Sequence, residues 1–138
     1  MRNLIFTVVL LTIGTSSLFS QKFRLGVGSE VIFVDDAYIA IQGRATYQAD
    51  DKNGISLNAN FHIGDSGWSA DLDYMYTLFS IGESLYCKPF AGLNKDDGIA
   101  LNLGVNLDIP INEKLLYAAP KFIIDKSSIF AFSVGILF

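Results

Sequence analysis

The sequence has few of the residues from which metal centres and disulfide frameworks are built. Its 138 residues include one cysteine, one histidine and three prolines. Cys87 has no partner within the chain for a disulfide, and a single histidine among scattered carboxylates does not give the ligand spacing of a zinc site. The acidic turns lack a complete calcium-binding loop, and no glycine-rich phosphate loop is present. We therefore expect neither a metal nor a cofactor.

Long hydrophobic runs are missing from all but the N-terminus. Arg2 and Asn3 precede an uncharged apolar run, 4–13, and then a stretch of small and polar residues, 14–20. That run is shorter than the roughly 20 residues that a transmembrane helix requires. Residues 1–20 are therefore predicted to form a cleaved secretory signal peptide, which leaves 21–138 as a single domain.

Positive charge is also scarce, because 10 basic residues stand against 14 acidic ones and the formal net charge is −4. Loss of Arg2 with the predicted signal peptide would make the charge about one unit more negative. An acidic domain without a basic patch repels the phosphate backbone of DNA and RNA. We therefore expect no nucleic-acid partner.

Alternating hydrophobicity, in contrast, is abundant. Between 22 and 138 the chain contains eight segments in which apolar and polar residues alternate, as in 99–109. Period-two alternation indicates strands with one apolar face. Clusters rich in glycine, asparagine and aspartate separate the segments, and these residues favour tight turns. The pattern predicts an all-β, antiparallel, eight-stranded up-and-down barrel with short turns, and a bulge at each of two prolines that interrupt it, Pro89 and Pro120.

The charged residues of the strands share one face. Four acidic residues lie outside the turns, and each of them falls on the polar face of its strand. The basic residues of the strands fall on that face too, provided that the two proline-containing segments take the matching register. Charges in a narrow barrel need partners because desolvation is costly. We predict an ion-pair network in the lumen formed by Arg24, Glu30, Arg44, His62, Asp71, Asp73, Lys88, Asp108 and Lys121.

A barrel of this kind can close with its apolar face inward or outward. Inward closure would give a soluble periplasmic barrel that binds a hydrophobic ligand, but the many large apolar side chains overfill a narrow interior. Outward closure places them against lipid in strands of about the length that crosses a bilayer, and pairs every backbone group. We predict the outward, transmembrane arrangement, with a girdle of aromatic side chains at both rims: Phe23, Tyr47, Tyr76 and Phe138 at one, and Phe33, Phe61, Trp68 and Phe130 at the other.

The last segment, 128–138, alternates strictly and ends on Phe138. Together with the exported start and the stretch 89–93 (PFAGL), it resembles the small OmpA/OmpX-type eight-stranded barrels of Gram-negative outer membranes. The resemblance implies outer-membrane lipid and the barrel-assembly machinery as partners, a monomer, and an assembly signal made of Phe132, Val134, Ile136 and Phe138. It departs from that family in its loops, which are too short for the adhesive work of many relatives.

The resemblance also raises the alternative of a lipid-modifying barrel enzyme. In that hypothesis His62 would act as a general base with Asp71 or Asp73 and activate a nearby serine. No nucleophile motif supports it, and a hydrogen bond between His62 and Asp71 within the lumen is the simpler expectation. We therefore expect a non-enzymatic protein with a structural or envelope-interaction role, whose filled lumen passes no large current.

Overall fold

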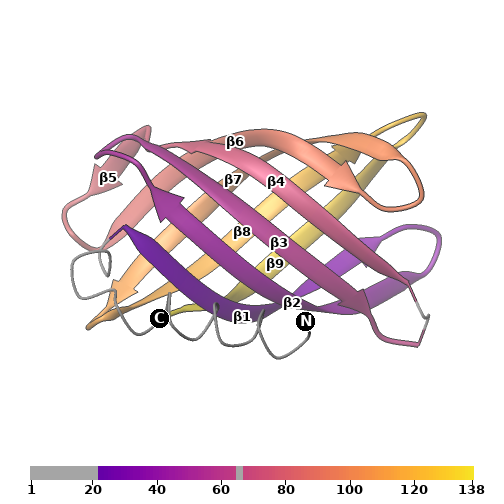
Figure 1. The fold of residues 1–138 in the computed structure, drawn as a ribbon, viewed down its shortest axis with the longest axis horizontal. Helices are drawn as coiled ribbons and strands as arrows, with labels where there is room; N and C mark the ends of the chain where they lie inside the picture. The colour runs from indigo at the N-terminus through magenta and orange to yellow at the C-terminus, as the bar shows by residue number, and fades with distance from the viewer. Residues whose placement is uncertain (1–21, 65–66) are drawn as a thin grey trace, which may run out of the picture.

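The computed structural model describes residues 22–64 and 67–138, so the predicted signal peptide lies outside the described residues. These residues form nine strand segments (Figure 1), which are β1 (Phe23–Phe33), β2 (Ala37–Gln48), β3 (Asn53–His62), β4 (Trp68–Tyr76), β5 (Phe79–Ile81), β6 (Leu85–Lys95), β7 (Ile99–Ile111), β8 (Lys114–Ile124) and β9 (Ser128–Leu137). None of the described residues forms a helix long and apolar enough to cross a membrane.

The strands close into a barrel in which each pairs antiparallel with its neighbours in the chain. The order β4-β3-β2-β1-β9-β8-β7-β6-β5 becomes a ring because β4 also pairs with β6. Both β4 and β5 pair with β6, β4 along 90–95 and β5 along 85–87, so together they fill one barrel position. The predicted all-β, antiparallel, eight-stranded barrel is confirmed, but its fourth strand is interrupted rather than continuous.

The interruption of the fourth strand is a β-bulge opposite Pro89. Met75 pairs with Phe90 and Phe79 pairs with Cys87, so four steps along β4 and β5 face three along β6. Proline offers no N–H to a ladder, and an extra residue on the facing strand relieves the mismatch. The bulge predicted at Pro89 is therefore present.

The second proline is accommodated differently. Lys121 pairs with Gly104 and Ala118 pairs with Leu107, so the register between β7 and β8 is the same on both sides of Pro120. The pairs between these two points are missing from the ladder, whereas pairing with β9 continues through Pro120. The bulge predicted at Pro120 is wrong, because the missing N–H is absorbed by a local opening of one ladder without an extra residue.

The strands are strongly tilted. A path that starts at Phe23 and steps from each residue to its partner on the next strand passes through Tyr74 and Leu103 and returns to β1 at Phe33, ten residues further along. Eight strands with this stagger tilt steeply to the barrel axis and enclose an interior that side chains can fill. The stagger also decides which residues of non-adjacent strands meet in the lumen.

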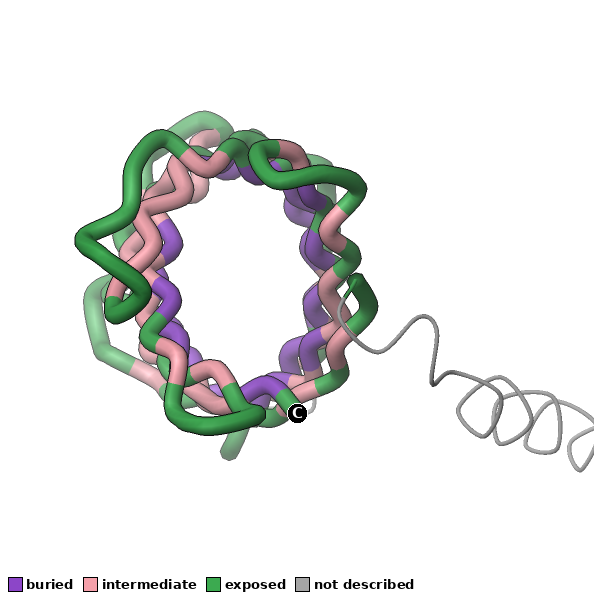
Figure 2. Tube along the Cα trace, turned by 90° about the vertical axis from the view of Figure 1, so that its left-hand side faces the viewer, coloured by how far each residue is buried: buried purple, intermediate pink, exposed green. Residues whose placement is uncertain are grey.

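The faces of the barrel are inverted relative to a soluble protein. Side chains alternate between buried and exposed along the strands, and the buried positions line the inside of the ring (Figure 2). Among the described residues, 15 polar or charged residues are buried against 8 hydrophobic ones, and most large hydrophobic side chains are exposed on the outer surface. The observed closure is thus the outward one.

The barrel has two ends, which we call the proximal mouth and the distal mouth. The proximal mouth is the end where β1 begins and β9 ends, with the turns 49–52, 82–84 and 112–113. The distal mouth, at the opposite end, carries the connections 34–36, 63–67, 96–98 and 125–127. At the proximal mouth the two-residue turn 112–113 places Asn112 at a φ of 55°, a conformation that asparagine tolerates well.

Candidate functional site

The centre of the lumen is organised around a buried lysine. Lys121 on β8 lies between two carboxylates, and its Nζ is 2.8 Å from Glu30 Oε2 on β1 and 2.8 Å from Asp71 Oδ2 on β4. The lysine side chain is 3% exposed and both carboxylates are fully buried. The three strands are not neighbours in the sheet, so this contact spans the interior of the barrel. We call these three residues the central cluster.

A polar shell of neutral side chains donates further hydrogen bonds to the carboxylates of the central cluster, although Glu30 Oε1 has no hydrogen-bond partner among the described residues. Ser133 Oγ donates to Glu30 Oε2 at 2.6 Å. Three asparagine amides donate to Asp71, namely those of Asn60, Asn94 and Asn102, at 2.7–3.1 Å. The Asn102 amide also donates to Asp73 Oδ1 at 3.1 Å, which ties Asp73 to the cluster. Buried charges held by so many donors are expensive to disturb, because each lost partner leaves a desolvated group behind.

A second layer, formed by Arg44, Tyr117 and Gln42, lies beside the central cluster on its proximal side. The Arg44 guanidinium sits 4.3 Å from the centroid of the Tyr117 ring, and the Tyr117 hydroxyl donates to Gln42 Oε1 at 2.7 Å. Gly28 and Gly135 face each other across β1 and β9, and a Cβ at either position would come within 2.5 Å of the Tyr117 hydroxyl. The small residues on these strands therefore make room for a large side chain that blocks the lumen.

A second ion pair stands apart from the central cluster. Lys88 Nζ on β6 is 2.8 Å from Asp108 Oδ2 on β7, and it also donates to Gln48 Oε1 at 3.3 Å. Arg24 lies at the proximal mouth, where its Nη1 donates to the backbone carbonyl of Glu113 at 2.9 Å. The predicted network is thus divided, with Glu30, Asp71, Asp73 and Lys121 at the centre and Lys88 with Asp108 nearer the proximal mouth.

The structure does not place His62 against Asp71. Asp71 pairs in register with Asn58, whereas His62 lies four residues further along β3, towards the distal mouth. The His62 ring packs edge-on against Tyr38 with the centroids 5.2 Å apart, and among the described residues its Nε2 has no hydrogen-bond partner. The register of the hairpin formed by β3 and β4 keeps the histidine away from both carboxylates, and the expected bond between His62 and Asp71 is absent.

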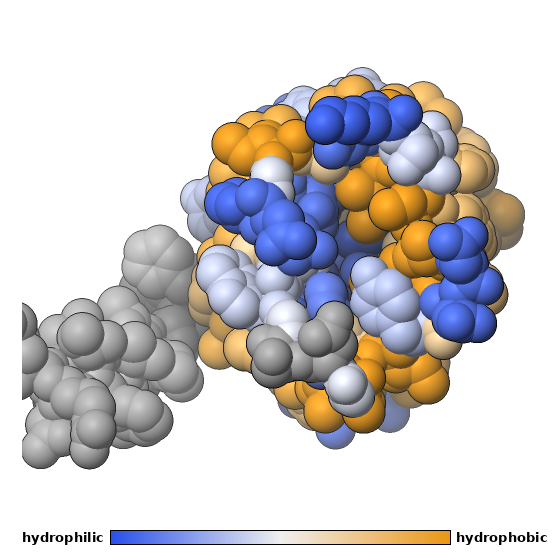
Figure 3. All heavy atoms as spheres, turned by 90° about the vertical axis from the view of Figure 1, so that its right-hand side faces the viewer, coloured by the Kyte–Doolittle hydropathy of each residue, from blue (hydrophilic) through white to orange (hydrophobic). Residues whose placement is uncertain are grey.

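Two vestibules open at the ends of the lumen and are separated by the central residues. The proximal vestibule has a volume of about 340 Å³ and the distal one about 200 Å³, and neither is lined by Glu30, Arg44 or Lys121. Viewed from the distal mouth, hydrophilic side chains surround the opening and hydrophobic ones cover the outer wall (Figure 3). The two vestibules have no lining residue in common.

The charges of the two vestibules differ. The proximal vestibule is lined by four basic residues, Lys22, Arg24, Lys88 and Lys114, and by two acidic ones, Asp51 and Asp108. The distal vestibule is lined by three acidic residues, Asp96, Asp97 and Asp125, and by Lys126 and His62. In the described residues no group of three or more histidine, cysteine, aspartate and glutamate side chains is placed to hold a metal ion.

The carboxylate of Asp50, in a turn at the proximal mouth, is occupied by hydrogen bonds within that turn and is not free for a ligand. Asp50 accepts hydrogen bonds from the Asn53 side-chain amide and from the backbone N–H groups of Lys52 and Asn53. These bonds, led by the one from the Asn53 side chain, lower the pKa of the Asp50 carboxyl below its usual value. The carboxylate serves the turn between β2 and β3, as aspartates in tight turns commonly do.

The predicted girdle residues occupy both rims of the outer surface. All eight are at least partly exposed: Phe23, Tyr47, Tyr76 and Phe138 at the proximal mouth, and Phe33, Phe61, Trp68 and Phe130 at the distal mouth. Phe130 packs against Phe33 and Phe122, with ring centroids 5.6 and 5.4 Å apart. On β9, Phe132 and Val134 are exposed and Ile136 is half-buried, on the same outer face.

Several lumen residues were missed from the sequence because they are apolar or neutral. Met75, Phe90 and Ala119 form a buried hydrophobic cluster inside the barrel, and Tyr117 is 1% exposed. The segments that carry Phe90 and Tyr117 alternate poorly, so parity gave no signal for them. The asparagines of the polar shell fall on the polar face of their strands. Their large number on that face is the feature of the sequence that could have indicated a hydrogen-bonded core.

The comparisons with known proteins agree with the fold. Neither a protein-family model nor a curated protein sequence matches the chain. The N-terminal β-barrel domain of Pseudomonas aeruginosa OprF superposes with a TM-score of 0.69 at 17% identity, over 85% of this chain and 96% of that one. The attachment invasion locus protein Ail of Yersinia pestis, solved with the heparin analogue sucrose octasulfate, gives 0.52 at 12% identity, over 84% and 95%. The fold is thus shared with these two solved barrels, in agreement with the fold that the resemblance implied.

Proposed function

We propose that this protein is an integral outer-membrane β-barrel with a structural or envelope-interaction role and a lumen filled by its own side chains. The observation that carries the proposal is the inverted distribution of polarity, with large hydrophobic side chains outside and charged ones inside. In water such a surface would drive aggregation, whereas in a bilayer it is the favourable arrangement. The aromatic side chains at both rims support the same environment.

The membrane location is tested by fractionation. Washing cell membranes with urea or carbonate should leave the barrel in the pellet, and detergent should release it. The released protein should migrate differently on a denaturing gel before and after heating, because a closed barrel resists unfolding in the detergent until heated. Clean release into the soluble periplasmic fraction would contradict the proposal and favour a soluble barrel.

A non-enzymatic role is favoured by the position of the single histidine. His62 packs against Tyr38 at the distal end, and the carboxylates that could orient it are bound by asparagine amides and Lys121. A catalytic base needs a positioned partner and a nucleophile within hydrogen-bond reach. His62 Nε2 has no hydrogen-bond partner among the described residues, which supports a non-enzymatic role.

An adhesive role receives little support from the loops. The connections at the distal mouth are short, and the longest of them spans 63–67. Ail is named as an attachment protein and was solved with a heparin analogue. Among the charged residues that line the distal vestibule, three aspartates stand against one lysine, and this negative balance repels a sulfated ligand. We therefore favour a structural role, or contact with envelope components, over recognition of sulfated sugars.

Reconstituted protein should carry no large current across planar bilayers. The central cluster and the Tyr117 layer separate the two vestibules, so a hydrated ion would have to displace buried, hydrogen-bonded charges. Recordings with a wide porin in the same bilayers provide the positive control. Stable steps of porin size from this barrel would contradict the closed lumen.

We also propose that the barrel-assembly machinery recognises the outer face of β9, made of Phe132, Val134, Ile136 and Phe138. Phe138→Ala should lower insertion severalfold in vesicles that contain the machinery, because it removes an exposed aromatic side chain from this face. Phe61→Ala, which removes an equally exposed rim aromatic from β3, is the matched control and should insert like the wild type. Equal insertion of the two variants would leave recognition of β9 without support.

A further inference from the structure

We propose that the proximal vestibule binds a soluble phosphate-bearing anion. The vestibule has a volume of about 340 Å³, which is in the range of pockets that hold small molecules, roughly 300–1,000 Å³. Four basic residues and two acidic ones line it, although the whole chain is acidic. Lys88 is paired with Asp108, whereas Arg24 donates to a backbone carbonyl and forms no ion pair among the described residues.

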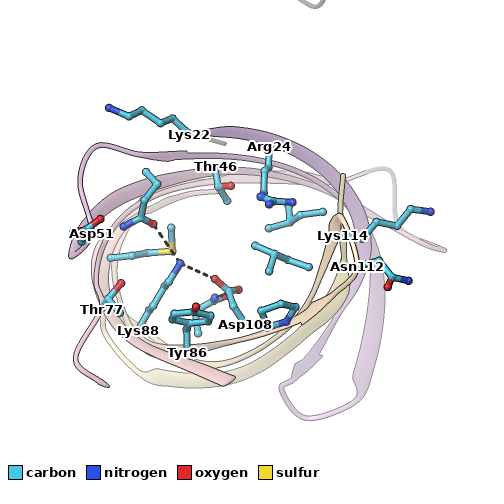
Figure 4. A pocket seen from close by; sticks show the side chains of 16 residues that line it. Lys22, Arg24, Thr46, Asp51, Thr77, Tyr86, Lys88, Asp108, Asn112 and Lys114 are labelled. Carbon is cyan, nitrogen blue, oxygen red and sulfur yellow. Dashed lines mark hydrogen bonds and ion pairs between the residues drawn. The ribbon is translucent and has the colours of Figure 1, made fainter. Parts of the chain in front are cut away.

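The donors of the vestibule converge from different sides of the ring. Figure 4 shows four side chains pointing into the space, Arg24 from β1, Thr46 from β2 and Tyr86 and Lys88 from β6, while Lys22 and Lys114 extend away from it at the rim. A tetrahedral phosphate can accept hydrogen bonds from several directions at once, and arginine and lysine are its usual partners. The two outer lysines would raise the local concentration of an anion before it enters.

The two inner cations retain donors that the protein does not use. Arg24 donates through Nη1 to the Glu113 carbonyl, and a guanidinium has five N–H donors in all. Lys88 contacts Asp108 and Gln48, which leaves one of the three ammonium protons. The buried Thr77 hydroxyl in the vestibule wall has no hydrogen-bond partner among the described residues. These unused donors would be satisfied by the oxygens of a phosphate.

The route into the vestibule favours a soluble ligand over a phospholipid. The strands that surround it are hydrogen-bonded to their neighbours close to the rim, with β1 joined to β2 from Phe23 and β7 joined to β8 to Ile111. A lipid tail cannot pass through a closed ladder, whereas a small anion can enter from the aqueous side along the barrel axis. Asp108 opposes binding, because it is the carboxylate that competes for Lys88.

Isothermal titration calorimetry tests the proposal. The mature chain, refolded in neutral detergent micelles, is titrated with inorganic pyrophosphate. At low salt we expect saturable binding of about one pyrophosphate per barrel, weakened by added sodium chloride. Arg24→Gln should weaken it about tenfold or more, because one charge-assisted contact is lost. Asp108→Asn should tighten it by freeing Lys88. Far-UV circular dichroism and heat-dependent gel mobility establish that each variant is folded.

The matched control is Lys95→Gln, which removes the same unit of charge from an exposed lysine near the distal mouth. We expect its affinity for pyrophosphate to equal that of the wild type. The proposal is overturned if the wild type shows no saturable binding, or if Lys95→Gln weakens binding as much as Arg24→Gln. In a competition arm, displacement by dihexanoyl phosphatidylglycerol but not by glycerol phosphate would overturn the assignment of a soluble ligand.

Discussion

Replacement of Lys121 by methionine is expected to destabilise the folded barrel by about 3–5 kcal/mol, the usual cost of leaving a buried charge without its partner. Glu30 and Asp71 are fully buried, and both lose the ammonium group that lies 2.8 Å away. The serine and asparagine donors remain, but they are neutral and cannot offset two carboxylates in a low-dielectric interior. Urea-induced unfolding in lipid vesicles, followed by tryptophan fluorescence, measures the free energy of unfolding.

Lys95→Met is the matched control, since Lys95 is exposed and its Nζ contacts only the backbone carbonyl of Asp96 among the described residues. Its expected effect is within about 0.5 kcal/mol, as for most surface substitutions. A double-mutant cycle that combines Lys121→Met with Glu30→Gln should recover part of the loss, because the second change removes one of the stranded charges. If Lys121→Met and Lys95→Met unfold at the same urea concentration, the central cluster does not stabilise the barrel as argued.

The faces of the strands could be predicted from the sequence because the period of a strand is two. Once Glu30, Asp71 and Asp108 proved to share a parity with the small polar residues, every other residue of the regular strands was assigned to a side. The structure buries all three carboxylates. Parity requires no knowledge of which strands are neighbours, so it is robust to errors in the turns.

The partners inside the lumen could not be predicted, because they depend on the stagger of the whole barrel. Lys121 meets Glu30 and Asp71 across the interior from strands that are not adjacent. A change of stagger would slide the facing walls past one another and exchange the partners while leaving each hairpin unchanged. The bulge opposite Pro89 contributes to that stagger, and a sequence indicates where a bulge is useful but not which strand carries the extra residue.

The division of the predicted network could not be predicted from parity either, because its members lie at different heights along the barrel axis. His62 and Arg24 share the parity of the central cluster, yet they lie near the distal and the proximal mouth, respectively. Parity fixes the side of the wall and says nothing of height along the barrel axis. The two proline-containing strands alternate poorly, so their pattern did not assign Phe90 and Tyr117 to a face. Both side chains are buried in the lumen and fill part of its volume.

The second large effect concerns the outer wall, where Leu57→Arg should lower the free energy of unfolding in vesicles by about 2–4 kcal/mol, as arginine does at the bilayer midplane. Leu57 lies in the middle of β3, is 54% exposed, and pairs in register with Ala45 and Leu72, both on the same outer face. An apolar surface at this position would be unfavourable in water. In lipid an apolar surface is favourable, because a guanidinium there must either be desolvated or draw water into the hydrocarbon.

Ile99→Arg provides the comparison that separates lipid from any other apolar environment. Ile99 is 67% exposed and begins β7 at the distal rim, where the same substitution should cost about 0–1 kcal/mol because the side chain reaches the interface. Chemical unfolding of both variants, in vesicles and again in detergent micelles, gives the depth dependence. A soluble barrel predicts nearly equal and small effects at the two positions, so equal stability of Leu57→Arg and Ile99→Arg in vesicles would exclude the transmembrane arrangement.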